Sequence, residues 1–184
     1  MTLATQLKLT AGTALTLLCL HAASAADRAN ATLKDKQGKE VGTVELMQTP
    51  AGVLLRLSLK GVPPGERAFH IHAAGKCEPP FESAGGHFNP DKRKHGILSG
   101  EGHAGDMPNL HVPQSGQLEV EVVNAAISLD EGKPNSVFQP AGTSIVIHAG
   151  KDDYKSDPAG NAGDRIACGV IQEGVSTVGG PAAK

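Results

Sequence analysis

The sequence predicts an all-β protein, a sandwich or flattened barrel of antiparallel strands. Apolar and polar side chains alternate with a period of two, most clearly in Leu118-Glu119-Val120-Glu121-Val122. Glycine and proline are frequent, with 23 and 12 among 184 residues, and many stand in short runs between the alternating segments. No segment keeps the apolar stripe of period 3.6 that a packed helix requires.

The alternating segments follow one another at the spacing expected of such strands. Typical of the turn-forming runs between them are Thr49-Pro50-Ala51-Gly52 and Gly61-Val62-Pro63-Pro64-Gly65. Length and composition allow one domain, which we assign to residues 26–175, followed by a small-residue tail at 176–184 that we expect to be disordered. The strands expected are residues 30–36, 41–47, 55–59, 68–73, 118–122, 144–149 and 166–171.

Two long segments interrupt this pattern. Residues 74–113 are rich in glycine, proline and histidine and contain no convincing strand, and residues 149–165 form a second polar loop. Loops of this length inside a compact domain usually carry function. We therefore expect the functional site in these two loops, with a disulfide, a metal or both to order them.

The first 25 residues have the pattern of a cleaved secretory signal. Lys8 precedes a mainly apolar run at residues 9–20, and Ala23-Ser24-Ala25 offers the small residues that signal cleavage needs. The apolar run is too short to cross a bilayer, which takes about 20 residues. The expected location is periplasmic or secreted, with no membrane association after cleavage.

Cleavage after residue 25 removes one of the three cysteines and leaves Cys77 and Cys168. An even number of cysteines in an oxidising compartment favours one disulfide, and the alternative is a pair of free buried thiols. The formal net charge of −2 argues against a broad basic face for nucleic acid and favours a small partner. Eight histidines stand out against this background, and histidine is the commonest metal ligand.

One group of histidines lies on predicted strands. His70 and His72 are two residues apart and so point to one face of a strand, while Phe69 and Ile71 point into the core. Alone, this spacing is equally compatible with a polar strand face. His148, at the end of another strand, supplies a further nitrogen for the same ion, and a set of imidazoles suits Cu(II).

A second group lies in the long loop. His95, His103 and Asp106 offer the nitrogen and oxygen ligands that zinc takes tetrahedrally. His87 stands between the two groups. A deprotonated imidazole can bind through both ring nitrogens, so His87 is a candidate for a ligand shared by two ions.

These motifs together resemble a known family. They closely resemble copper/zinc superoxide dismutase of the secreted bacterial type, over nearly all of the chain after residue 25. The motifs, in chain order, are His70-x-His72, Gly85-Gly86-His87-Phe88-Asn89-Pro90, Gly102-His103-Ala104-Gly105-Asp106, Ile147-His148 and Gly160-Asn161-Ala162-Gly163-Asp164-Arg165-Ile166-Ala167-Cys168-Gly169-Val170-Ile171.

The resemblance implies a Greek-key β-sandwich or barrel that holds one copper and one zinc ion per subunit. The implied activity is disproportionation of superoxide to dioxygen and hydrogen peroxide. By the same resemblance, Cys77 and Cys168 form the intrasubunit disulfide, Arg165 binds the substrate anion, His87 takes part in catalysis and Asp152 links a copper histidine to a zinc histidine. The implied copper ligands are His70, His72, His87 and His148, and the implied zinc ligands are His87, His95, His103 and Asp106.

Several polar residues lie outside the two implied ligand sets. A simpler interpretation of Arg165 is a surface ion pair with Asp164 or Asp157. His111 is not required by either ion, and we expect it to be partly exposed or hydrogen-bonded. Because the net charge is slightly negative, steering of an anion would need a local basic patch. The candidates for that patch are Lys92, Arg93, Lys94 and Lys155.

Two other functions use the same ligands. A metal carrier would favour softer ligands, yet Met47 and Met107 form no cluster in the sequence. A zinc hydrolase would need a general base beside the metal, and Glu101 is the only near candidate. Neither function accounts for His70, His72, His148 and Arg165 beside the zinc set. The sequence leaves monomer and homodimer open.

Overall fold

A computed structural model describes residues 27–174, and the proposed signal at 1–25 and tail at 176–184 lie outside this range. Its only helical element in that range is a short 3₁₀ turn, η1 (Glu82–Ala84), and no helix there is long and apolar enough to cross a membrane. The strands are β1 (Arg28–Asp35), β2 (Glu40–Thr49), β3 (Gly52–Lys60), β4 (Gly65–Arg67), β5 (Phe69–His72), β6 (Leu110–Val112), β7 (Gln117–Asn124), β8 (Ser144–His148), β9 (Arg165–Val170) and β10 (Gln172–Glu173).

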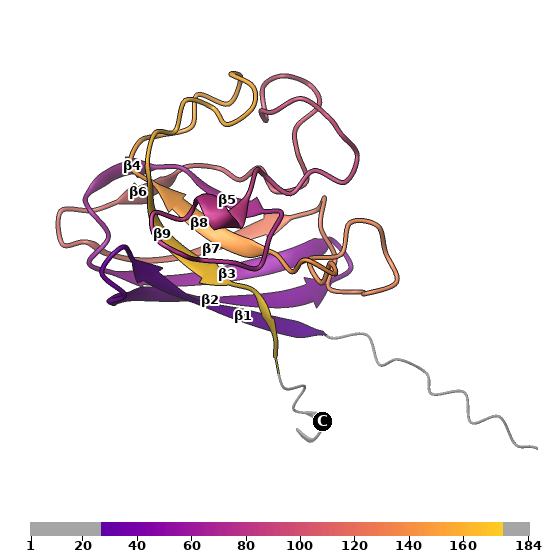
Figure 1. The fold of residues 1–184 in the computed structure, drawn as a ribbon, viewed down its shortest axis with the longest axis horizontal. Helices are drawn as coiled ribbons and strands as arrows, with labels where there is room; N and C mark the ends of the chain where they lie inside the picture. Colours follow the sequence, from indigo (N-terminus) through magenta and orange to yellow (C-terminus); the bar gives the residue numbers. More distant parts are fainter. Residues whose placement is uncertain (1–26, 175–184) are drawn as a thin grey trace, which may run out of the picture.

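The strands form one curled antiparallel sheet in the order β5-β8-β9-β1-β2-β3-β7, with β10 pairing β1 and a separate pair β4-β6 (Figure 1). The first three strands follow one another as hairpins, and β9 returns from far along the chain to pair with β1. Strands far apart in the chain thus become neighbours in the sheet, at β1-β9, β3-β7 and β5-β8. The predicted all-β fold is therefore confirmed.

The core lies on the inner face of this sheet and is mainly aliphatic. Burial alternates along β1, β2 and β3, as the period of two predicts, so that every second side chain enters the core. Phe69 and Phe88 are the aromatic members of the main cluster. Its fully buried aliphatic side chains include Leu33, Val44, Leu46, Val53, Leu55, Leu57, Ile71, Leu129, Ile145 and Ile147.

The seven expected strands are all present, with differences at their ends and in the connections. Residues 74–113 do contain a strand, β6, which pairs with β4, a strand that was not predicted and that begins at the last residue of the Gly61–Gly65 turn. Leu110 and Val112 on β6 are both buried. The prediction was wrong here because a three-residue strand shows only one alternation, too short a pattern to recognise.

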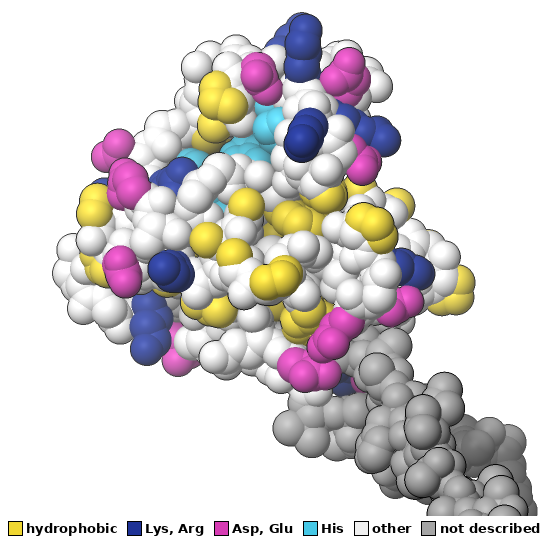
Figure 2. Space-filling model, turned by 45° about the vertical axis from the view of Figure 1, so that its right-hand side comes forward, with side chains coloured by type: hydrophobic (Ala, Val, Ile, Leu, Met, Phe, Trp, Pro, Cys, Tyr) yellow, Lys and Arg dark blue, Asp and Glu magenta, His cyan; other side chains and the backbone are white. Residues whose placement is uncertain are grey.

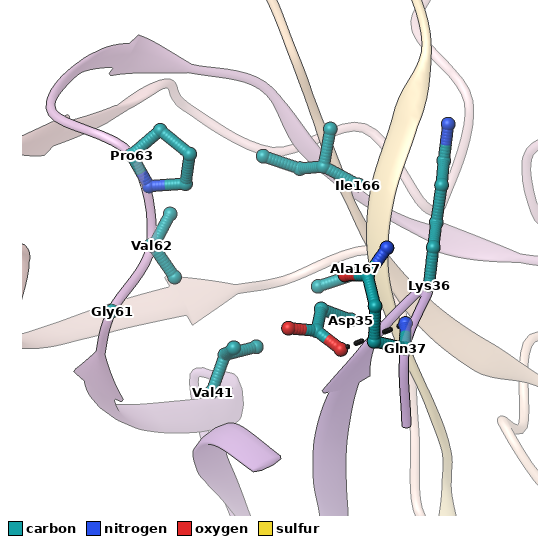
Figure 3. A pocket seen from close by; sticks show the side chains of 9 residues that line it. All are labelled: Asp35, Lys36, Gln37, Val41, Gly61, Val62, Pro63, Ile166 and Ala167. Atoms are coloured by element: carbon teal, nitrogen blue, oxygen red, sulfur yellow. Dashed lines mark hydrogen bonds between the residues drawn. The ribbon is translucent and has the colours of Figure 1, made fainter. Parts of the chain in front are cut away.

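One end of the curled sheet opens into a pocket of about 250 Å³ (Figure 3). The β1–β2 turn, the segment after β3 and the start of β9 line this pocket, and Ile166 of β9 reaches into it. Neighbouring residues of a strand point to opposite faces. Arg165, immediately before Ile166, is therefore directed away from this pocket, toward the side of the sheet that carries the long loops.

The disulfide between Cys77 and Cys168 is present, with the two Cα atoms 5.6 Å apart. It joins the loop after β5 to the middle of β9 across 91 residues of sequence. Cys168 packs with Phe81, Ala84 and Val146 in a second, smaller cluster of buried residues. The bridge thus fixes residues 77–85 against the sheet.

Removing this bridge should lower the stability of the fold. In the chain-entropy model, opening a loop of this length increases the freedom of the unfolded chain by about 4–5 kcal/mol. The C77S/C168S double variant should therefore lose about that much free energy of unfolding in urea titrations of the metal-free protein. The K133A variant, changed at an exposed lysine, is the control, and equal stability of all three proteins would contradict the expectation.

Candidate metal centre

Strand β5 places the first two candidate ligands. All four of its side chains are buried, because Phe69 and Ile71 enter the aliphatic core while His70 and His72 are covered on the opposite face by the long loops. His70 is 0% exposed and His72 is 1% exposed. The alternative of a solvated polar strand face is therefore wrong.

The pairing of β8 with β9 brings His148 and Arg165 together. The register shifts after Ile147, so that Ile147 pairs with Ala167 whereas His148 pairs with Arg165. Such bulges turn side chains out of the regular alternation and are common beside functional sites. As a result the last residue of β8 and the first of β9 are direct neighbours, and both line one pocket.

The long loop docks on the free edge of β5 through backbone hydrogen bonds. His87 forms an isolated bridge with His72, and the N–H groups of Phe88 and Ile71 donate to Ile71 and Gly105 carbonyls at 2.8 and 2.9 Å. A Cβ atom on Gly105 would lie 2.2 Å from the Ile71 oxygen, so this approach requires glycine. The docking brings His87 beside the strand histidines.

Four buried nitrogens in the resulting cluster have no hydrogen-bond partner within residues 27–174. They are Nδ1 of His70 and Nε2 of His72, His87 and His148. Buried polar atoms are seldom left unpaired, because an unpaired buried group costs free energy. The four side chains offer ligand atoms within 4.8 Å of one another. A nitrogen-rich set of this kind fits copper.

Asp106 organises the second set of ligands. Its Oδ1 lies 2.9 Å from Nδ1 of His87, 2.9 Å from Nδ1 of His95 and 3.4 Å from Nδ1 of His103. Its Oδ2 accepts the backbone N–H groups of Gly96 and His103 at 2.9 and 2.8 Å. Three imidazole nitrogens and one carboxylate within 4.8 Å fit the tetrahedral preference of zinc.

His87 belongs to both sets through different atoms. Its Nε2 is one of the four unpartnered nitrogens, and its Nδ1 faces Asp106. A second link runs through Asp152, whose Oδ2 lies 2.8 Å from Nε2 of His70 and whose Oδ1 lies 3.0 Å from Nε2 of His95. The Asp152 carboxylate therefore links His70 of the copper set to His95 of the zinc set. It contacts Nε2 of each ring, which leaves Nδ1 of each ring for the metal ion.

Burial keeps the imidazoles of His72, His87 and His148 neutral. Desolvation by burial lowers the pKa of His72 to about 2, of His148 to about 3 and of His87 to about 4. Burial alone would raise the pKa of Asp106, but hydrogen bonds from His103 and His87 outweigh it and hold that pKa well below its usual range. Neutral imidazoles and an ionised carboxylate are the forms that bind metal ions.

A pocket of about 370 Å³ gives access to the cluster, and Figure 2 shows histidine side chains in a hollow of the surface. The guanidinium of Arg165 lines it and donates to the carbonyls of Phe81 and Gly85 at 2.6 and 2.7 Å. The alternative pairing of Arg165 with Asp164 or Asp157 is therefore wrong. The sequence did not indicate these two partners, because every residue carries a backbone carbonyl and no side-chain pattern marks the ones that accept.

Known proteins share this fold and this ligand pattern. The family model described as copper/zinc superoxide dismutase (SODC) matches residues 40–171, which include every residue of both sets. The chain belongs to this family. Superoxide dismutase [Cu-Zn] 1 of Aquifex aeolicus is 55% identical over 148 residues, covering 79% of this chain and 88% of the relative.

Two further relatives extend the comparison. A crystal structure of a SOD-like protein from Bacillus subtilis superposes with a TM-score of 0.73 at 37% identity, covering 77% of this chain and 96% of that one. A protein of Haemonchus contortus named extracellular superoxide dismutase [Cu-Zn] is 39% identical over 140 residues, covering 72% of this chain and 74% of the relative.

The family and the geometry together show a copper/zinc superoxide dismutase, an oxidoreductase that acts on superoxide. Both predicted ligand sets, with His87 shared, are confirmed. A zinc hydrolase is not supported, because its candidate general base, Glu101, is exposed and accepts the backbone N–H of Lys94 at 3.0 Å. The carrier alternative lacks soft ligands, because each ligand in these sets is a histidine or a carboxylate.

The basic candidates differ in their positions. Arg93 lines the pocket that leads to the metal ligands, and its side chain is 53% exposed. Its Nη2 atom lies 3.2 Å from Oδ2 of Asp91. Lys92, Lys94 and Lys155 are exposed and do not line it. His111 lies on β6 and is exposed, with its Nδ1 atom 3.8 Å from Oε1 of Glu66. This position outside both ligand sets is the one expected from the sequence.

Acid should destabilise the metal-free protein. The pKa values of His72, His87 and His148 lie below the usual 6.5, so the unfolded chain binds protons where the folded chain does not. Stability is then complete above pH 6.5 and falls as the pH drops toward about 4, by up to about 1.4 kcal/mol per pH unit for each histidine. Burial alone would lower the pKa of His103, but Asp106 outweighs it and raises that pKa, so the contribution of His103 to stability is fully present below pH 6.5 and is lost only as the pH rises above that value, outside this interval.

Urea unfolding of the metal-free protein between pH 7.5 and 4.5 measures this slope. The H111A variant is the control, because its histidine is exposed and its removal should leave the profile unchanged. A stability that stays constant or rises as the pH falls through this interval would show that the buried cluster is protonated in the folded state.

Proposed function

We propose that Arg165 binds superoxide in the pocket beside His148 and that His87 delivers a proton to the product. The observation that carries this proposal is the guanidinium of Arg165, held by two carbonyls in the pocket that His72, His87 and His148 also line. Copper, when bound, supplies one-electron exchange, because it has two accessible oxidation states whereas zinc has none.

Arg165 is suited to hold a small anion. A guanidinium stays charged at every relevant pH and offers several N–H donors in one plane. Two of its nitrogens are already bonded, Nη1 to the carbonyl of Phe81 and Nη2 to that of Gly85, so the side chain is fixed before the substrate arrives. Preorganised donors of this kind stabilise charge without rearranging during the reaction.

His87 can serve as the proton-holding group through its Nε2 atom. That nitrogen has no hydrogen-bond partner within residues 27–174, and the residue lines the pocket. Its Nδ1, directed at Asp106, keeps the ring oriented while Nε2 takes up and releases a proton. Asp152 fixes the orientation of His70 and His95, because a hydrogen bond to the outer nitrogen of a liganding imidazole sets its tautomer.

We also infer that the enzyme works outside the cytoplasm, in the periplasm or as a secreted protein, against superoxide formed there. Residues 1–25 supply a secretory signal pattern, and a disulfide persists in an oxidising compartment. One chain carries both complete ligand sets and Arg165. Activity therefore requires no residue from a partner subunit, whether the enzyme is a monomer or a homodimer.

The R165A variant tests substrate binding. It should bind both metals as the parent does, because Arg165 belongs to neither ligand set, and lower turnover tenfold or more through loss of the anion donor. Metal content and superoxide decay measured by pulse radiolysis check the two parts. The R56A variant removes an arginine paired with Glu121 on the outer face of the sheet and should keep full turnover. Full turnover in metal-loaded R165A would refute the role.

The R93A variant tests steering. If Arg93 attracts the anion from the mouth of the pocket, the parent rate should fall as ionic strength rises, because salt screens charges beyond about 8–10 Å. R93A should be slower at low salt and show a weaker salt dependence. Parallel K92A, K94A and K155A variants rank the exposed lysines, with K133A as the remote control. A full salt dependence in R93A would remove Arg93 from the steering patch.

A further inference from the structure

Asn109 holds the segment that carries Asp152, although it contacts neither ligand set. Its Oδ1 accepts the backbone N–H of Asp152 at 2.8 Å, and its Nδ2 donates to the backbone carbonyl of Asp152 at 2.9 Å. Its own N–H donates to the hydroxyl of Tyr154 at 2.6 Å. One asparagine thus satisfies both backbone polar groups of Asp152, and we call these two side-chain bonds the Asn109 clamp.

The position of Asp152 determines whether its carboxylate can reach both metal sets. The side chain is 1% exposed, with 2.8 Å to His70 Nε2 and 3.0 Å to His95 Nε2, and it also accepts the Tyr154 N–H at 2.6 Å. A Cβ atom on Gly160 would lie 1.9 Å from Asp152 Oδ1, so the chain closes tightly behind the carboxylate. There is little room for the carboxylate to move without losing one of its histidines.

We propose that Asn109 is a positioning residue that couples the two metal sites by fixing the backbone of Asp152. Asn109 lies three residues after Asp106, so the clamp ties the segment that carries a zinc ligand to the loop that links the zinc and copper histidines. This role rests on the proposed function and adds to it the residue that holds Asp152 in place beside the two metal sites.

An asparagine side chain meets both requirements of the clamp. It offers one acceptor and one donor side by side, which match an N–H and a carbonyl of a single residue. An aspartate in its place would set a negative oxygen against the Asp152 carbonyl, and an alanine would leave both backbone groups unpaired. When a metal-binding histidine loses the hydrogen-bond partner of its other ring nitrogen, metal affinity typically falls 10–100-fold.

The test measures metal binding of the N109A variant of the full chain, by chelator competition with zinc alone and with copper alone. We expect the affinity for each ion to fall tenfold or more, since His70 and His95 both lose their oriented partner. The visible absorption of bound copper should shift as well, because it reports the arrangement of its ligands. The N135A variant, which loses one side-chain bond to the Ala126 carbonyl far from the site, is the matched control.

Two more variants keep the outcome decisive. N109D keeps the acceptor but sets a negative oxygen against the Asp152 carbonyl, so it should also lower both affinities tenfold or more, and it serves if N109A does not fold. Y154F removes only the hydroxyl and should keep both affinities within about twofold. Unchanged affinities in a folded N109A, or a loss confined to zinc, would overturn the coupling. These measurements need no superoxide, so they can fail while the role of Arg165 stands.

Discussion

The burial of six imidazoles, with His87 shared by both ligand sets, is the constraint on which the rest of the structure depends. In the copper set, four ring nitrogens have no hydrogen-bond partner within residues 27–174, an arrangement that a bound cation makes favourable. Every neighbouring feature serves to hold these rings in place. The strand supplies His70 and His72 rigidly, the docked loop supplies His87, and the carboxylates of Asp106 and Asp152 orient the rings from outside.

The disulfide has a role in the site as well as in stability. It fixes residues 77–85 against β9, and that segment carries the Phe81 and Gly85 carbonyls that hold the Arg165 guanidinium. Gly85 also accepts a hydrogen bond from Nδ1 of His72, leaving Nε2 for the metal. One short loop thus orients both a copper ligand and the arginine beside it, and its anchor is the bond between Cys77 and Cys168.

The two long loops stabilise each other around the zinc set. The N–H of His95 donates to Asp157 at 2.7 Å, and the N–H of Leu98 donates to the carbonyl of Tyr154 at 3.1 Å. Figure 1 shows the two loops side by side on one side of the sheet. Apolar anchors such as Phe88 and Met107 are few in these long loops, so polar clamps, a disulfide and metal ligands complete their ordering.

The sequence by itself determined the chemical identity of the site and the class of the fold. Alternation with a period of two is a local property, and His-x-His on a strand fixes a common face without any long-range contact. Ligand types and their order along the chain also lie in the sequence, which explains why the shared role of His87 was predictable. A short strand such as β6 was missed because its pairing with β4 is not local.

The tertiary structure alone decided which atoms meet. It selected Nδ1 of His70 but Nε2 of His72 for copper, because Asp152 and the Gly85 carbonyl occupy the opposite nitrogens. It also separated Arg93, at the mouth of the pocket, from Lys92, Lys94 and Lys155, and it revealed Asn109 behind Asp152. These outcomes depend on contacts between segments far apart in the chain, whose distances and directions no local pattern of residues encodes.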